Sequence, residues 1–536
     1  MRADPSGAGA PGAGHADAGA PGAGAPLPIE GGAANATERL TARPVAVPAA
    51  HLDAVRDAGG RVWTGSAERA EAGRDWWPLA IGWAAHGQVP ARPAAVVRPA
   101  SADQVAHLLA ACNDDLVPVT PIAGRSGVCG GAVPLFGGVA LDCTGLVGRV
   151  VVDETSLLAE VPAGTFGPDL EQALRGAGSG YTLGHFPQSF ELSTLGGWIA
   201  CRSAGQYSTR YGKIEDMVVG LEVALADGRV VRTGGRAPRE ATGPSLTQLF
   251  TGSEGVLGVI TRAWLRVHPA PPAEGRRAYG WERFADGLDA CRRVLRRGAT
   301  PAVLRLYDRT ESERTWGRPG NCVLVVLDEA DPGLLEATLA VVDDECAGAE
   351  RLDDAVVARW LETRSDVSAL APLWQGGVAV DTAEVAGRWA ILPSLAEDVV
   401  SALSALDGTL AASVHQSHAY LDGACLYFTF AARDPSGGTG GGGGTGGGTG
   451  GGAGGGEWTE RYYRRAWDTV FEVVTRHGAS ISHHHGIGLS RGRFLPGALG
   501  GAFEVLAALK RALDPNGILN PGKLGLPSPY GEVPWP

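Results

Sequence analysis

The chain has 536 residues, enough for roughly two to four domains with a large core. Hydrophobic residues make up 44% and charged residues 19% of it, as in globular proteins, and no run approaches the ~18 apolar residues of a membrane span. The net charge of -12 argues against a broad basic face, so we expect no nucleic acid as a partner.

The beginning of the chain has no pattern of a compact fold. Residues 1–45 are rich in Ala, Gly and Pro and lack the apolar run of about 7 to 15 residues that a secretory signal needs. We expect a disordered tail there, followed by a lead-in over residues 46–90. Eight cysteines without a CxxC pair predict neither a disulfide framework nor a zinc ribbon, which indicates a cytoplasmic location.

From residue 91 on, short apolar runs alternate with amphipathic segments. Ser101 and Gln104 have the spacing of a capping box, which predicts that a helix begins there. A strand, a helix and a second strand near the start favour a parallel unit in a layered α+β or α/β domain. The predicted strands are 94–98, 117–121, 138–142 and 157–161.

Longer helical patterns follow from residue 272 and predict a second α+β domain. Between its segments, residues 437–456 are almost entirely glycine, which predicts a flexible loop. A last helix over 502–514 ends at a Pro-Asn-Gly stop signal. The other predicted helices are 284–297, 333–347 and 458–478, and the strands include 322–330 and 424–432.

Three glycine-rich segments are candidates for binding chemistry, at 121–131, 184–218 and 251–261. Consecutive backbone N–H groups in such turns can surround a phosphate or pyrophosphate. The first segment is neither a Walker loop nor a G-x-G-x-x-G fingerprint, so taken alone an ordinary turn explains it as well.

Six motifs in order resemble those of one enzyme family: PIAGRSG, QSFELSTLGGW, YGKIEDMV, GSEGVLGVIT, HHHGIG and DPNGILNPGKL. The chain resembles the FAD-binding flavoproteins of the vanillyl-alcohol oxidase and p-cresol methylhydroxylase type. Within that superfamily it is most similar to alkylglycerone-phosphate synthase and its bacterial FAD-linked oxidase relatives, over about residues 90 to 525.

The resemblance implies an α+β fold in two main parts. An FAD-binding domain over 91–271 would hold a small parallel or mixed sheet and a larger antiparallel sheet. An α+β cap or substrate domain over 272–485 would follow. Residues 486–526 would return to the FAD-binding domain and leave a tail at 527–536.

The resemblance also implies which residues bind FAD. The first turn would hold the pyrophosphate, the second would follow the ribityl and isoalloxazine parts, and the third would complete the cradle. Several family members attach the flavin to a histidine in the first turn, where this chain has Gly124-Arg125-Ser126-Gly127, so we expect dissociable FAD. Arg125 would pair with a phosphate oxygen or be a solvated turn residue. The implied residues are Pro121, Ile122, Ala123, Gly124, Arg125, Ser126, Gly127, Gln188, Ser189, Phe190, Glu191, Leu192, Ser193, Thr194, Cys201, Arg202, Ser203, Ala204, Glu254, Gly255, Val256, Leu257, Gly258, Val259 and Ile260.

A tyrosine in the second domain is the first catalytic candidate. Strand alternation puts Tyr427 on one face, where it can meet a cavity, and Phe428 and Phe430 on the other. The resemblance implies that Tyr427 acts in proton transfer, and a buried structural tyrosine is the alternative.

A run of three histidines, His483, His484 and His485, is the second candidate. In an extended backbone His483 and His485 share a face. The resemblance puts the run beside the flavin as acid–base groups or substrate partners. Zinc is the competing interpretation, but we find no segment with the spacing of a third ligand, so we expect no metal.

Three further residues complete the candidate set. His415 and His418 precede Tyr427 closely enough to approach the same pocket and bind substrate. Arg305 matches an arginine that lies near the flavin in the synthase, where it would stabilise negative charge, and a surface salt bridge is the alternative.

Two functions remain open on this scaffold. The first is a synthase-like exchange that forms an ether bond on an acylated dihydroxyacetone phosphate, or a bacterial oxidoreductase variant of it. The second is an FAD-linked dehydrogenase or oxidase of a 2-hydroxy acid (D-lactate or glycolate type) or another alcohol. The chain has His-His-Gly where the D-lactate and glycolate type usually has Glu-His-Gly, which favours the synthase group. Two differences argue against a literal synthase. Only Arg364, out of register, stands near the position of the arginine expected to bind the substrate phosphate, and His415 replaces a second synthase arginine.

A flavin-binding protein without catalysis is the least favoured interpretation, because a site that has lost its catalytic function would not require Tyr427 and three histidines together. As a partner we expect a small-molecule or lipid-like substrate. We expect no transmembrane segment. A transient membrane contact and a homodimer stay open.

Overall fold

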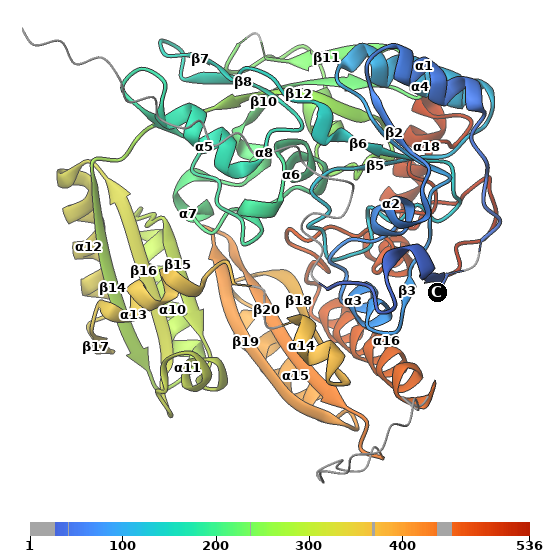
Figure 1. Cartoon of the computed structure of the whole chain (residues 1–536). Helices are drawn as coiled ribbons and strands as arrows, with labels where there is room; N and C mark the ends of the chain where they lie inside the picture. Colours follow the sequence, from blue (N-terminus) through green and yellow to red (C-terminus); the bar gives the residue numbers. More distant parts are fainter. Residues whose placement is uncertain (1–26, 41, 236, 367–369, 437–452, 536) are drawn as a thin grey trace, which may run out of the picture.

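The computed structural model describes residues 27–40, 42–235, 237–366, 370–436 and 453–535 (Figure 1). Its two smaller sheet layers, blue to green in the picture, lie above a large sheet drawn in yellow to orange. The predicted division into an FAD-type part with two sheets and an α+β cap is therefore present.

The small sheet has the strand order β2-β4-β6-β5, in which β4, β6 and β5 are parallel. A helix, α4 (Ala102–Asp114), connects β4 to β5 and is capped by Ser101, whose Oγ accepts a hydrogen bond from Gln104 N at 3.3 Å. Gln104 Oε1 accepts from Ala100 N at 2.8 Å, so the predicted cap closes one residue earlier than in a standard capping box. The strands are β2 (Arg61–Trp63), β4 (Ala95–Arg98), β5 (Val119–Ile122) and β6 (Val139–Asp142), with α1 (Ala49–Asp57) packed on α4.

The second sheet is antiparallel, in the order β11-β10-β12-β8-β7. Its buried face packs on α5 and α6 through Leu170, Leu195 and Ile199. The strands are β7 (Val151–Asp153), β8 (Leu158–Pro162), β10 (Val218–Ala224), β11 (Val230–Gly234) and β12 (Val259–Arg266). The helices are α5 (Gly167–Arg175), α6 (Leu195–Cys201), α7 (Ser208–Tyr211), α8 (Ile214–Met217) and α9 (Leu246–Phe250).

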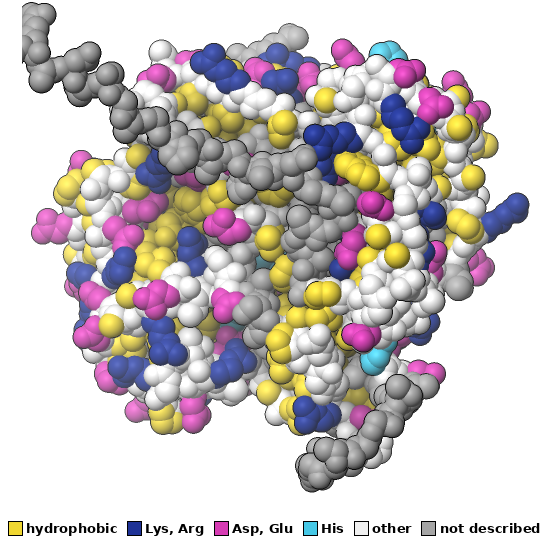
Figure 2. Space-filling view, in the orientation of Figure 1, with side chains coloured by type: hydrophobic (Ala, Val, Ile, Leu, Met, Phe, Trp, Pro, Cys, Tyr) yellow, Lys and Arg dark blue, Asp and Glu magenta, His cyan; other side chains and the backbone are white. Residues whose placement is uncertain are grey.

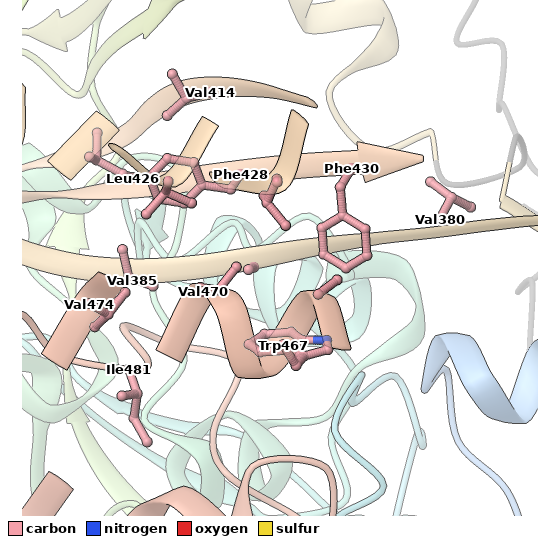
Figure 3. Close-up of a cluster of buried hydrophobic side chains, with 14 of the residues drawn as sticks. Val380, Val385, Val414, Leu426, Phe428, Phe430, Trp467, Val470, Val474 and Ile481 are labelled. Atoms are coloured by element: carbon pink, nitrogen blue, oxygen red, sulfur yellow. The ribbon is translucent and has the colours of Figure 1, made fainter. Parts of the chain in front are cut away.

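The cap is built on a seven-stranded antiparallel sheet in the order β17-β14-β16-β15-β19-β20-β18. Phe428 and Phe430 of β20 belong to a buried apolar cluster with Trp467 and Val470 of α16, shown in Figure 3. This confirms the predicted alternation, because Tyr427 points the other way. The strands are β14 (Ala273–Trp281), β15 (Val303–Tyr307), β16 (Cys322–Ala330), β17 (Glu350–Leu352), β18 (Val378–Arg388), β19 (Thr409–Ala419) and β20 (Gly423–Arg433). The helices are α10 (Phe284–Arg296), α11 (Arg309–Trp316), α12 (Pro332–Glu345), α13 (Ala355–Thr363), α14 (Leu370–Gln375), α15 (Leu392–Ser404) and α16 (Ala453–Arg476).

The end of the chain lies beside the small sheet. Val119 N donates to Ile518 O, and Asn520 N donates to Val119 O, each at 2.8 Å, so these residues extend the sheet next to β5. Two helices precede them, α17 (Leu495–Leu499) and α18 (Ala502–Leu513). The remaining elements are α2 (Ser66–Ala72), α3 (Pro78–Ala84) and the paired short strands β1 (Thr37–Glu38) with β3 (Gln88–Val89) and β9 (Tyr181–Thr182) with β13 (His268–Pro269).

Two sequence predictions need correction. The disordered tail was predicted over residues 1–45, but Leu27, Ile29 and Leu40 are buried in the main apolar core, and their burial holds residues 27–40 in place. The glycine-rich loop was predicted to extend to residue 456, but α16 begins at Ala453. Residues 1–26 and 437–452 lie outside the described part of the chain.

The surface agrees with the composition. On the face shown in Figure 2, basic and acidic side chains are interspersed rather than gathered by sign. Among the residues that the structure describes, no helix has both the length and the apolar character needed to cross a membrane.

Candidate active site

A cavity of about 430 Å³ lies where the FAD-type part meets the cap. This volume is within the range of about 300 to 1,000 Å³ that small-molecule and cofactor sites occupy. All three glycine-rich turns and the cap residues Tyr427, His484 and His485 contribute to its wall. The predicted residues that line it are Pro121, Ile122, Ala123, Gly124, Arg125, Ser126, Gly127, Gln188, Ser189, Leu192, Ser193, Thr194, Cys201, Ser203, Ala204, Glu254, Gly255, Gly258, Val259 and Ile260.

Glycines let the three turns pack against one another. A Cβ on Gly124 would lie 2.0 Å from the carbonyl oxygen of Leu192 in the second turn. Gly255 of the third turn has φ +75°, and a Cβ there would lie 3.0 Å from Pro121 of the first. The cavity is therefore walled by backbone, which can approach a diphosphate closely, and the residues present fit FAD.

Five predicted cofactor residues do not line the cavity. Val256 and Leu257 are buried in the core beneath the antiparallel sheet. Arg202 ends α6 in the left-handed region and pairs with Glu215 at 3.2 Å. Phe190 stacks on Trp198, 6.3 Å between ring centroids, and Glu191 is exposed. Each motif is contiguous in sequence, but some of its residues face the core or the surface instead of the cavity.

Arg125 is held inside the wall rather than solvated. It has φ 54° and donates a hydrogen bond from Nη1 to the carbonyl oxygen of Glu71. Burial lowers the pKa of the guanidinium, which nevertheless stays charged at neutral pH. A cation fixed in the first turn suits a diphosphate.

Tyr427 and His485 form a hydrogen-bonded pair on the cap side of the cavity, between Tyr427 Oη and His485 Nε2. Burial raises the pKa of the Tyr427 phenol well above its usual value and lowers the pKa of His485 to about 4. At neutral pH both groups are therefore uncharged, and the phenol donates to Nε2 in the tautomer of His485 that carries its proton on Nδ1.

The histidine run is bent, which corrects the prediction that His483 and His485 share a face. His484 and His485 line the cavity, whereas His483 stacks on His418 with 5.1 Å between ring centroids. The backbone bends at all three histidines. The carboxylate of Glu384 accepts hydrogen bonds from the backbone N–H groups of both His483 and His485.

The structure places His418, predicted as a substrate-binding residue, beside the histidine run, where it adds a third imidazole. His418, His483 and His484 each place a ring nitrogen within 4.8 Å of the others. His418 was missed as a ligand because it lies on β19, far from the histidine run in sequence. Burial lowers the pKa of His483 and His484 to about 3, so these rings are neutral. The argument that no third ligand exists is therefore wrong, and the absence of a metal stays a prediction.

Arg305 and His415 lie behind Tyr427 and do not line the cavity. Arg305 donates hydrogen bonds to Tyr307 Oη and His415 Nε2, both at 3.1 Å, and is 7% exposed, so it is not a surface salt bridge. His415 stacks on the ring of Tyr427, 5.0 Å away, and its Nδ1 lies 2.9 Å from Glu311 Oε2. His415, the cross-strand neighbour of Tyr427, thus supports its ring from β19, and Arg305 holds His415.

Several carboxylates at the cavity were missed in the sequence. Asp75, Asp366 and Asp381 line it, together with Thr382. Burial raises the pKa of Asp75 and of Asp381 to about 6. The sequence analysis missed them because each is a single aspartate outside any recognised motif, in the segment before the FAD-binding domain, in a loop and in a strand. Arg364 instead donates from Nη1 to Gln206 Oε1 at 2.6 Å and does not line the cavity.

Comparison with known proteins gives matches over most of the chain. The descriptions of an FAD binding domain and of the C-terminal domain of FAD linked oxidases match residues 93–234 and 277–524. The FAD-linked oxidoreductase YgcU of Escherichia coli O157:H7 is 31% identical over 449 residues, covering 81% of this chain and 89% of YgcU. The alkyldihydroxyacetonephosphate synthase of Dictyostelium discoideum is 28% identical over 477 residues, covering 82% and 74%.

A solved structure supports the same fold. An alkyldihydroxyacetonephosphate synthase superposes with a TM-score of 0.71 at 24% identity and covers 90% of this chain and 87% of the synthase chain. The predicted arrangement of two FAD-side sheets and a cap is thereby confirmed.

Proposed function

Since this chain belongs to the FAD-linked oxidoreductase family, we propose that it oxidises an uncharged alcohol, with Tyr427 and His485 removing the hydroxyl proton. That it is an enzyme that uses FAD follows from the family. The choice of reaction and substrate is our proposal.

The observation that carries the proposal is the Tyr427–His485 hydrogen bond on the wall of the same cavity as the three glycine-rich turns. The three turns would hold FAD, which would supply the acceptor for a hydride from the carbon of the alcohol. The hydroxyl proton moves to the Tyr427 oxygen as the phenol proton moves to His485 Nε2. The substrate thereby loses a hydride and a proton and leaves as a carbonyl compound.

The charges around the cavity favour an uncharged substrate. Asp366 and Asp381 lie in the wall on the cap side with Tyr427. Asp381, with a pKa of about 6, is largely ionised at neutral pH and would repel a carboxylate or a phosphate. Among the described lining residues the one arginine or lysine is Arg125, in the turn that suits the diphosphate. Arg305 and Arg364 are engaged elsewhere.

Anaerobic mixing tests the proposal. Purified enzyme is mixed with a panel of neutral primary and secondary alcohols and, separately, with D-lactate and glycolate. We expect loss of the flavin absorbance with a neutral alcohol and none with the hydroxy acids. Bleaching by a hydroxy acid alone would contradict the substrate class, and no bleaching by any alcohol would contradict the reaction.

Ether-bond-forming exchange is the second candidate. It is favoured by the 28% identity to a synthase, combined with a tyrosine and histidines that meet at one cavity. Exchange of a long-chain alcohol into an acylated dihydroxyacetone phosphate, without lasting flavin reduction, would establish this activity in place of the first.

A further inference from the structure

Glu384 of β18 is fully buried and holds the histidine run from below. Its carboxylate accepts hydrogen bonds from Ser482 Oγ at 2.9 Å, from His485 N at 2.8 Å and from His483 N. Arg491 donates to the same carboxylate at 2.9 Å and is 1% exposed. One carboxylate therefore fixes the backbone of the run at both ends.

Glu384 also faces the ring of His485. Its Oε1 lies 3.7 Å from His485 Nδ1, and this nitrogen has no hydrogen-bond partner among the described residues. When Nε2 accepts the hydrogen bond from the Tyr427 hydroxyl, the neutral ring carries its own proton on Nδ1, toward the carboxylate. The negative charge of Glu384 favours this tautomer over the one protonated on Nε2.

We propose that Glu384 is a positioning residue that holds His485 with Nε2 free to accept a proton and that balances the positive charge His485 gains. This inference rests on the proposed function, in which the alcohol proton moves to the Tyr427 oxygen as the Tyr427 proton moves to His485 Nε2, and FAD would supply the hydride acceptor. Glu384 forms and breaks no bond in this step. Arg491 holds the carboxylate in place and opposes the charge on His485, so the balance depends on Glu384.

The test compares Glu384→Gln with the wild-type holoenzyme. We expect kcat to fall by about 10²-fold, as for loss of an acid–base group, while KM for the alcohol changes by less than about 3-fold. Glu384→Asp, which keeps the charge, should restore part of kcat. The matched control is Asp328→Asn, which alters another fully buried carboxylate paired with an arginine, Arg210, away from the cavity.

Nitrogen-15 NMR of the histidine side chains gives a readout that does not need turnover. The His485 signal is assigned by its loss in His485→Gln. In the wild type at pH 7 we expect Nδ1 protonated and Nε2 unprotonated, and in Glu384→Gln a mixture of tautomers. If Glu384→Gln does not fold, Glu384→Gln with Arg491→Met removes both buried charges and serves the same comparison.

Unchanged kcat and an unchanged His485 tautomer in either variant would overturn the inference. The proposed function fails separately, if Tyr427→Phe turns over alcohols at the wild-type rate. In that case the tautomer measurement still decides whether Glu384 orients His485.

Discussion

At the scale of single residues, burial decides the chemistry of the site. The phenol of Tyr427 and the imidazole of His485 would titrate at about 10 and 6.5 in water. In the cavity their pKa values move apart, upward for Tyr427 and to about 4 for His485. Both groups are then neutral over a wide pH range around 7, which allows a proton to pass through the pair without first charging either group.

Replacing Tyr427 with Phe removes the oxygen that accepts the substrate proton in the proposed reaction. We expect kcat to fall by ~10² or more with FAD retained, because the ring still fills its place. Steady-state kinetics and the flavin absorbance of the purified variant measure the two effects. Tyr462→Phe, which removes a hydroxyl bonded to Thr409 outside the cavity, is the control. Equal rates in the two variants would remove Tyr427 from the chemistry.

His185 provides a pH-dependent prediction outside the reacting pair. Burial, and then the nearby His484, lower its pKa to about 3, whereas the unfolded chain binds a proton near 6.5. As pH falls from 6.5 the unfolded state gains a proton that the folded state does not, so the wild type loses about 1.4 kcal/mol per pH unit from this group. His185→Gln should therefore gain about 2 to 3 kcal/mol relative to wild type between pH 6.5 and 4.5. Urea unfolding at both pH values measures this, and a pH-independent difference would contradict it.

At the scale of elements, local sequence patterns predicted the strands and helices well. The glycine-rich turns were assigned to FAD only through their resemblance to family motifs. The alternation at Phe428 and Phe430 and the cap at Ser101 depend on neighbours in sequence, so they were readable. Asp381 and Glu384 entered the site through strand pairing in the cap sheet, which no local pattern encodes. The face shared by His483 and His485 was mispredicted for the same reason, since the bent run contacts Glu384 and His418, which are distant in sequence.

Gly124 tests whether close packing of the turns forms the cavity. A Cβ there would meet the backbone carbonyl of Leu192, which cannot rotate away. We expect Gly124→Ala to destabilise the protein by about 1 to 3 kcal/mol and to lower its FAD content. Gly348→Ala is the control, because a Cβ there meets nothing within 4 Å. Thermal unfolding and the ratio of flavin to protein absorbance check both variants, and identical FAD content would refute the expectation.

At the scale of the whole molecule, the two ends of the chain hold the cap to the FAD-side sheets. Trp77 and Trp83 near the start pack edge to face with Trp535, at 5.0 and 6.1 Å between ring centroids. Trp77 and Trp83 also donate hydrogen bonds to Tyr463 and Glu460 of α16. This junction closes the side of the cavity to which Trp76 and Pro78 belong.

Trp535 is the part of this junction that is simplest to remove. It is 5% exposed, and the guanidinium of Arg464 lies 4.2 Å from its ring. Trp535→Ala should lower the free energy of unfolding by about 3 kcal/mol, as for other buried tryptophans. Leu421→Ala, at a side chain that is 68% exposed, should leave it within about 0.5 kcal/mol of wild type. Similar losses in the two variants would contradict the importance of the junction.

The pairing of Val119 with Ile518 and Asn520 has a consequence for synthesis on the ribosome. The strand that leads into the first glycine-rich turn emerges well before residues 518–520, which complete its hydrogen-bonding edge. A nascent chain therefore needs residues 518–520 before it can bind the flavin. We expect polypeptides that stop short of Ile518 to be purified colourless, while those that extend through Asn520 take up the flavin.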